Sequence, residues 1–208
     1  MPQPISRVAP DASIFLNNIG MFRLRELPEL ASLAMECIAT WATVESWMLN
    51  LYLDMAGGNR TSAAAMFLTL EANSARRAAL APLVETLQPL HQQLYAAIAG
   101  VMKSREKARN KLAHWVWGYT PDVPDAVLLA DPKALALQSG GLDRDQIYVY
   151  RKDDFLAIIA DNEELADWGM DFKRIINGHV SNHANQLYDA LCKAPAIAER
   201  LHRQAQQG

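Results

Sequence analysis

The longest regular feature of the sequence is an apolar stripe that runs from Leu27 to Met55. Apolar side chains recur there every three or four positions: Leu30, Leu33, Ala34, Ile38, Trp41, Val44, Trp47, Met48, Leu51 and Met55. Residues at that spacing share one face of an α-helix. The segment therefore predicts a long core helix. Pro28 suits the first turn, and Gly57-Gly58 supplies the stop.

Further helical patterns follow along the chain. Alanine-rich segments predict helices from Thr61 to Leu70 and from Asn73 to Leu87, with a kink or break near Leu80 caused by Pro82. Pro89 opens another long helical pattern, which we expect to end at Gly118.

The pattern changes after Pro121. Short apolar or alternating runs at 126–130 and 146–150 are bounded by Pro, Asp and Gly residues and predict a two-stranded hairpin. A helical pattern then continues from Asp153 or Asp154 to Cys192, with a break expected near Asn162. The last segment, Ala194 to His202, is predicted to fray.

These patterns together predict a mainly α fold. We expect an antiparallel helical bundle with a small β-hairpin insertion near 126–150. Residues 1–25 contain three prolines and one short amphipathic segment, Asp11 to Asn18, so we expect an arm with one or two helical turns. Residues 26–208 are expected to form a single domain, in which the hairpin and C-terminal helices occupy 121–208.

Composition narrows the function classes. The chain of 208 residues is 50% hydrophobic and 21% charged, with a formal net charge of -3, which is typical of a soluble globular protein. An acidic chain gives no general electrostatic reason to bind nucleic acid, so any such function must depend on a local basic patch. Cys37 and Cys192 are too few for a disulfide scaffold, and no leader or membrane-spanning segment is indicated. We therefore expect a cytoplasmic location and no membrane association.

One basic patch exists near the end of the predicted helix 89–118. Basic residues occupy five alternate positions: Lys103, Arg105, Lys107, Arg109 and Lys111. Within this run, Arg109 is followed directly by the polar Asn110, and His114 comes after four intervening residues. The aromatic sequence Trp115-x-Trp117-Gly118 follows at once.

This arrangement resembles the HEPN superfamily, whose helical domains carry an Arg, four to six residues and then a His, commonly with a polar residue after the Arg. The resemblance covers roughly residues 27–120. It also extends to the order of elements, with a long helix, two shorter helices and then the motif helix. Many HEPN proteins are metal-independent endoribonucleases, and a dimer is their usual arrangement. The resemblance implies such an activity, or RNA binding, in a toxin or defence setting, with RNA and an antitoxin protein as partners.

The residue chemistry is compatible with that implication. Cleavage of RNA without a metal ion or cofactor needs a proton-transfer group and a cation for the phosphorane. His114 could transfer protons because the unperturbed pKa of histidine, about 6.5, lies near neutrality. Arg109 could clamp the phosphate, and Asn110 could orient His114 or the ribose. Lys103, Arg105, Lys107 and Lys111 are the expected RNA-binding residues.

Helix geometry limits how Arg109 and His114 can meet in one catalytic site. Side chains five positions apart on a helix point in directions about 140° apart, so Arg109 and His114 of one chain do not converge on a regular helix. A distorted helix end or a two-fold partner chain is needed, and we expect a homodimer.

A structural explanation stands beside the catalytic one. A histidine at a helix C-terminus interacts favourably with the helix dipole, and a Lys/Arg run is often a solvated face. The alternative function is therefore a non-catalytic helical dimerisation or interaction module. Arg174 and His179 share the same spacing but lack the flanking features. Glu45 interrupts an apolar face, so it is either half exposed or paired with a cation such as Arg105 or Arg109.

Overall fold

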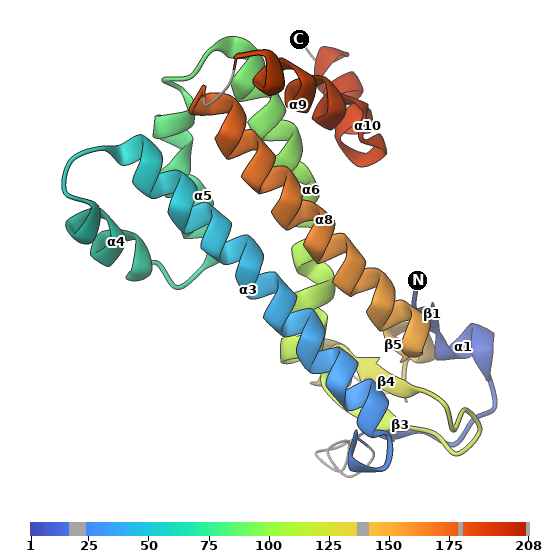
Figure 1. The fold of residues 1–208 in the computed structure, drawn as a ribbon. Coiled ribbons are helices and arrows are strands. Elements are labelled where there is room, and N and C mark those ends of the chain that lie inside the picture. The colour runs from blue at the N-terminus through green and yellow to red at the C-terminus, as the bar shows by residue number, and fades with distance from the viewer. Residues whose placement is uncertain (17–23, 137–141, 179–180, 207–208) are drawn as a thin grey trace. The chain divides into compact units, whose positions relative to one another are not determined.

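The computed structural model describes residues 1–16, 24–136, 142–178 and 181–206. The described chain is mainly helical with a small antiparallel sheet, as the sequence predicted (Figure 1). None of the helices within these ranges combines the length and apolar character needed to cross a membrane.

The chain divides into two compact units. One, which we call the mixed unit, contains Met1–Thr40 and Glu106–Asp161, and the other, the helical unit, contains Trp41–Arg105 and Asn162–Gly208. Three long helices contribute residues to both units: α3 (Pro28–Ala56), α6 (Pro89–His114) and α8 (Lys152–Ile176).

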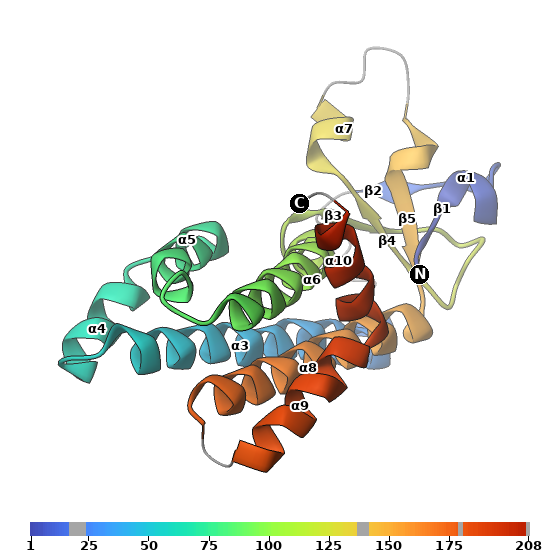
Figure 2. The same cartoon turned by 90° about the horizontal axis from the view of Figure 1, so that it is seen from above.

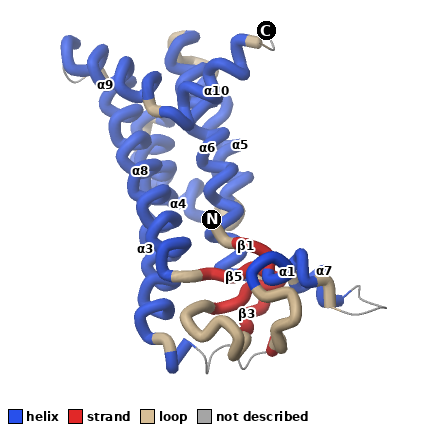
Figure 3. The backbone as a smooth tube through the Cα atoms, turned by 90° about the vertical axis from the view of Figure 1, so that its right-hand side faces the viewer, coloured by secondary structure: helices blue, strands red, loops and turns tan. Residues whose placement is uncertain are grey.

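The mixed unit contains the sheet, whose strands are drawn in red in Figure 3. Its antiparallel strand order is β1-β5-β4-β3-β2. The strands are β1 (Gln3–Pro4), β2 (Phe15–Leu16), β3 (Val116–Tyr119), β4 (Val127–Ala130) and β5 (Ile147–Tyr150). The predicted hairpin is confirmed, because β4 pairs with β5 from Val127 opposite Tyr150 to Ala130 opposite Ile147. The unit also contains the short helices α1 (Ile5–Val8) and α7 (Pro132–Ala136) and the 3-10 turn η1 (Arg144–Gln146).

Strand β4 explains how this sheet is held. Each of its four residues is buried, and alternate side chains join different apolar clusters. Val127 and Leu129 pack in a cluster that also contains residues of α3, α6 and α8, whereas Leu128 and Ala130 pack with Ile5 and other residues outside those helices. Since side chains alternate across a strand, the sheet has apolar packing on both faces.

Two sequence predictions in this unit are wrong. The helix expected to reach Gly118 ends at His114, and Val116–Tyr119 form β3, which pairs with both β4 and β2. The helical turn expected within Asp11 to Asn18 is replaced at Phe15–Leu16 by β2. Gly118 permits this pairing, because a Cβ there would lie 2.5 Å from the Phe15 carbonyl oxygen.

The helical unit has its own core. Buried side chains of α3, α6 and α8 meet there, including Trp41, Trp47, Ile98 and Phe172. The other helices of this unit are α4 (Arg60–Leu68), α5 (Asn73–Val84), α9 (Ser181–Lys193) and α10 (Pro195–Ala205), labelled in Figure 2. Asn59 caps α4 by accepting a hydrogen bond from the Ser62 N–H.

Several helix ends and breaks differ from expectation. Helix α5 continues past Leu80 to Val84 with Pro82 inside it, and α8 runs unbroken through the buried Asn162. The segment expected to fray is instead the regular helix α10, which buries Ile197. Pairing of apolar faces within the unit therefore overrides the local helix-breaking signals.

Candidate functional site

The candidate site lies at the C-terminal end of α6, in the mixed unit. Arg109 Nη1 donates a hydrogen bond to Asn110 Oδ1 at 3.2 Å, and both residues are half-buried. Arg109 Nε is buried and has no hydrogen-bond partner within the described chain. The neighbouring amide thus fixes one terminal nitrogen of the guanidinium.

His114 is the last residue of α6, and its side chain is exposed. The Trp115 N–H donates to the Lys111 carbonyl oxygen at 2.9 Å, so helical hydrogen bonding extends to the end of α6. This regular end leaves the directions of Arg109 and His114 about 140° apart. A distorted helix end, one of the two expected routes to convergence, is not observed.

Lys111 lies over two aromatic rings. Its Nζ is 4.6 Å from the ring centroid of Trp115 and 4.4 Å from that of Tyr148, which places the ammonium in favourable cation–π contacts. Burial lowers the pKa of Lys111, nearby Asp131 acts to raise it, and Lys107 acts to lower it further. Lys111 is therefore used in packing rather than extended into solvent.

The other expected RNA-binding residues differ in their surroundings. Lys103 and Lys107 are exposed. The Arg105 side chain is only 12% exposed, forms an ion pair with Glu164 and lies over the Trp168 ring at 4.8 Å from its centroid. Lys103 and Arg105 belong to the helical unit, so the candidate site is confined to Lys107 and the α6 residues that follow it.

Glu45 is paired with a cation, but the partner is Arg76 rather than Arg105 or Arg109. Arg76 Nη1 lies 3.0 Å from Glu45 Oε2, and the other carboxylate oxygen accepts hydrogen bonds from Trp41 Nε1 at 3.1 Å and Asn73 Nδ2 at 3.3 Å. Arg76 also donates from Nε to the Leu70 carbonyl oxygen at 2.8 Å. These contacts connect α3 with the start of α5.

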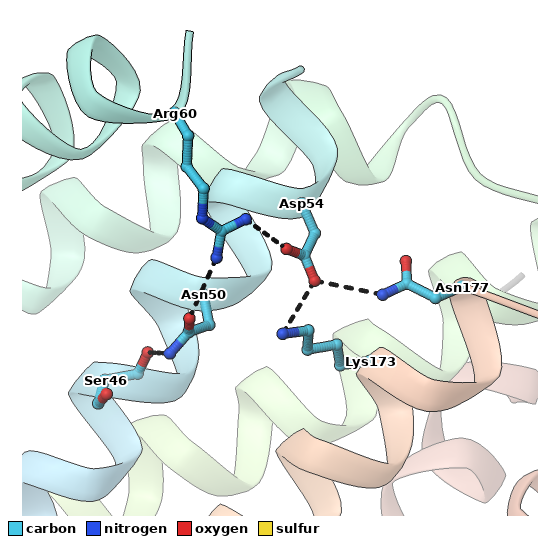
Figure 4. Close-up of polar contacts among 6 residues, drawn as sticks. All are labelled: Ser46, Asn50, Asp54, Arg60, Lys173 and Asn177. Carbon is cyan, nitrogen blue, oxygen red and sulfur yellow. Dashed lines mark hydrogen bonds and ion pairs between the residues drawn. The ribbon is translucent and has the colours of Figure 1, made fainter. Parts of the chain in front are cut away.

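A polar cluster in the helical unit was missed by the sequence reasoning. Asp54 accepts a hydrogen bond from Arg60 Nη1 at 2.9 Å and one from Asn177 Nδ2 at 3.2 Å, and it pairs with Lys173 Nζ at 3.0 Å (Figure 4). The residues come from α3, α4, α8 and the turn after α8. They share no sequence motif, and only the Gly57-Gly58 turn indicates that Arg60 folds back toward the end of α3.

The described side chains include no group of three or more His, Cys, Asp or Glu residues arranged to hold a metal ion. His179, the second member of the Arg174 pair with matching spacing, lies outside the described residues.

No family model matches the chain, and no curated protein or solved structure matches it either.

Proposed function

We propose that the protein is a metal-independent endoribonuclease whose active groups lie at the end of α6. The observation that supports this proposal is the arrangement of Arg109, Asn110 and His114. The guanidinium is oriented by the adjacent amide, and the imidazole is exposed at the same helix end.

The chemistry requires two proton transfers. His114, as the neutral base, takes the proton from the ribose 2′-OH, and the 2′-oxygen attacks phosphorus. Arg109 stabilises the negative charge of the phosphorane. The bond to the 5′-oxygen breaks, and that oxygen takes a proton from an imidazolium, which leaves a 2′,3′-cyclic phosphate and a 5′-OH.

A second copy of the chain completes the site. Because α6 is regular to its end, Arg109 and His114 of one chain do not face one point. A two-fold axis beside α6 brings Arg109 of one protomer toward His114 of its partner, so the dimer has two such sites, and in each the imidazolium formed in the first step donates the proton to the leaving 5′-oxygen. In this function the chain belongs to a toxin or defence system and is restrained by an antitoxin protein.

Purified protein incubated with RNA tests the activity. We expect cleavage products that end in a 2′,3′-cyclic phosphate and an unchanged rate in EDTA. His114→Ala should lower the rate by at least about a hundredfold, within the range of general acid–base contributions. His202→Ala is the matched control, because His202 is also an exposed histidine in the last turn of a helix.

Loss of activity in EDTA and its recovery with Mg²⁺ would contradict the mechanism. So would an equal effect of the His114 and His202 substitutions. Circular dichroism of each variant separates lost chemistry from lost structure.

A non-catalytic helical dimerisation module is the second candidate, and the contacts of Arg105 and Lys111 favour it. Both cations are used within the chain, one with Glu164 and Trp168 and the other over Trp115 and Tyr148. If this candidate is correct, the protein is a dimer by light scattering but neither cleaves nor binds RNA.

A further inference from the structure

The cluster around Asp54 holds an arginine in a fixed orientation at the surface. Arg60 donates from Nη1 to Asp54 Oδ1 at 2.9 Å and from Nη2 to Asn50 Oδ1 at 3.5 Å. The Asn50 amide is itself fixed, because its Nδ2 donates to the Ser46 carbonyl oxygen at 2.9 Å (Figure 4). The Arg60 side chain nevertheless remains 57% exposed. A guanidinium that is oriented from behind and open to solvent is prepared to bind an anion.

The charge of Asp54 is already compensated. Burial acts to raise its pKa, but hydrogen bonds from Arg60, Lys173 and Asn177 outweigh burial, so the pKa lies below its ordinary value. The carboxylate thus stays ionised at neutral pH and acts as a positioning residue for Arg60 and Lys173.

Further positive charge lies next to the cluster around Asp54. Arg174 is 57% exposed and pairs with Asp171 at 2.8 Å, a surface contact of the kind that contributes little and can exchange for a ligand. Counting Arg60, Lys173 and Arg174 against Asp54 and Asp171 leaves one net positive charge. Lys173 and Arg174 both lie in the last turn of α8, where their charges also offset the negative end of the helix dipole. The Lys173 side chain is only 24% exposed and pairs with Asp54, whereas Arg60 and Arg174 are each 57% exposed, so the two arginines are the principal anion contacts.

Asp54, Arg60, Lys173 and Arg174 line a cavity of about 590 Å³, whose lining also includes Leu53, Met170 and Asn177. That volume lies within the range of small-molecule sites. We propose that this cavity binds a small organic phosphate. Arg60 and Arg174 donate to the phosphate oxygens, Asn177 offers an amide, and Leu53 and Met170 contact the organic part.

The proposal is independent of RNA cleavage and is tested by calorimetric titration of the full chain with AMP and with inorganic phosphate. We expect both probes to bind, and AMP to bind more tightly because only AMP has an organic part that contacts the apolar wall formed by Leu53 and Met170. Arg60→Gln should weaken AMP binding by at least about tenfold, as expected for loss of a charged hydrogen bond. Arg174→Gln should also weaken binding, and it leaves the Asp54 network intact if Arg60→Gln proves unstable.

Arg203→Gln is the matched control. Arg203 is 60% exposed and pairs with Glu199 on α10, so it resembles Arg60 and Arg174 in exposure but lies outside the cavity lining. Its substitution should leave AMP binding unchanged. Failure of wild-type protein to bind either probe would overturn the proposal, as would equal affinities in the folded Arg60, Arg174 and Arg203 variants. Equal affinity for phosphate and AMP would overturn the contact with the apolar wall.

Discussion

Gly169 shows how closely one residue controls packing in the helical unit. A Cβ at this position would lie 2.3 Å from Trp47 Cδ2, and the Trp47 ring is buried. We expect Gly169→Ala to lower the free energy of unfolding by about 1–3 kcal/mol, because neither the ring nor the helix can move aside without disturbing the core. Urea unfolding of the variant measures this loss.

Gly100 provides the matched control within α6. The three atoms nearest to a Cβ there all belong to the flexible Arg200 side chain, with Nη1 at 3.2 Å. Since alanine is favoured over glycine in a helix interior, Gly100→Ala should be neutral or stabilising. If both variants lose the same stability, the contact with Trp47 does not explain the effect of Gly169.

Asp54 gives a pH-dependent prediction. Its pKa in the folded chain lies below the ordinary value of 3.8, so the unfolded state binds the proton more readily. The stability that Asp54 contributes is therefore fully present above its unfolded pKa and is lost as the pH falls through the folded pKa. Urea unfolding of wild type and Asp54→Asn should show a constant difference near neutral pH and a shrinking one below 3.8. A difference that grows on acidification would contradict the assignment of the ion pairs.

At the scale of elements, the edge strand β2 depends on Gly118. A Cβ at Gly118 would lie 2.5 Å from both the Phe15 carbonyl oxygen and Leu16 Cδ2. We expect Gly118→Ala to displace β2 while β4 and β5 stay paired, because those strands have their own buried contacts. Hydrogen exchange measured by NMR should accelerate at the β2 amide that donates to β3 and remain slow at Val149. Unchanged exchange at both amides would show that β2 tolerates the added carbon.

The long helices could be predicted because their apolar periodicity persists over many turns. The strand β3 could not, since Val116 and Trp117 continue the apolar stripe of α6, and a short apolar run fits a helix end as well as a strand. Strands β1 and β2 are two residues each and exist through pairing with distant residues. For the candidate site, the residues could be named from sequence, but the packing of Lys111 on Tyr148 and of Arg105 on Glu164 depends on tertiary contacts.

At the scale of the whole molecule, the proposed nuclease site gives a complementation prediction. Arg109→Ala and His114→Ala proteins should each be inactive alone, because a composite site needs one group from each protomer. When equal amounts of the two variants are mixed and exchange subunits, about half of the dimers contain one protomer of each variant. Each of these mixed dimers keeps one of its two sites, so about a quarter of wild-type activity should return. RNA cleavage by the mixture, with light scattering to confirm the dimer, checks this result. Mixtures that stay inactive despite exchange would exclude a site shared between protomers.

The division of the chain into two units has a practical consequence. Each unit is made of two separate stretches of sequence, and the chain passes between units at 40/41, 105/106 and 161/162. All three points fall inside α3, α6 and α8 rather than in linkers. Truncation from either terminus therefore cannot isolate one unit. Production of either unit alone needs its two stretches to be rejoined by a designed connection across interrupted helices.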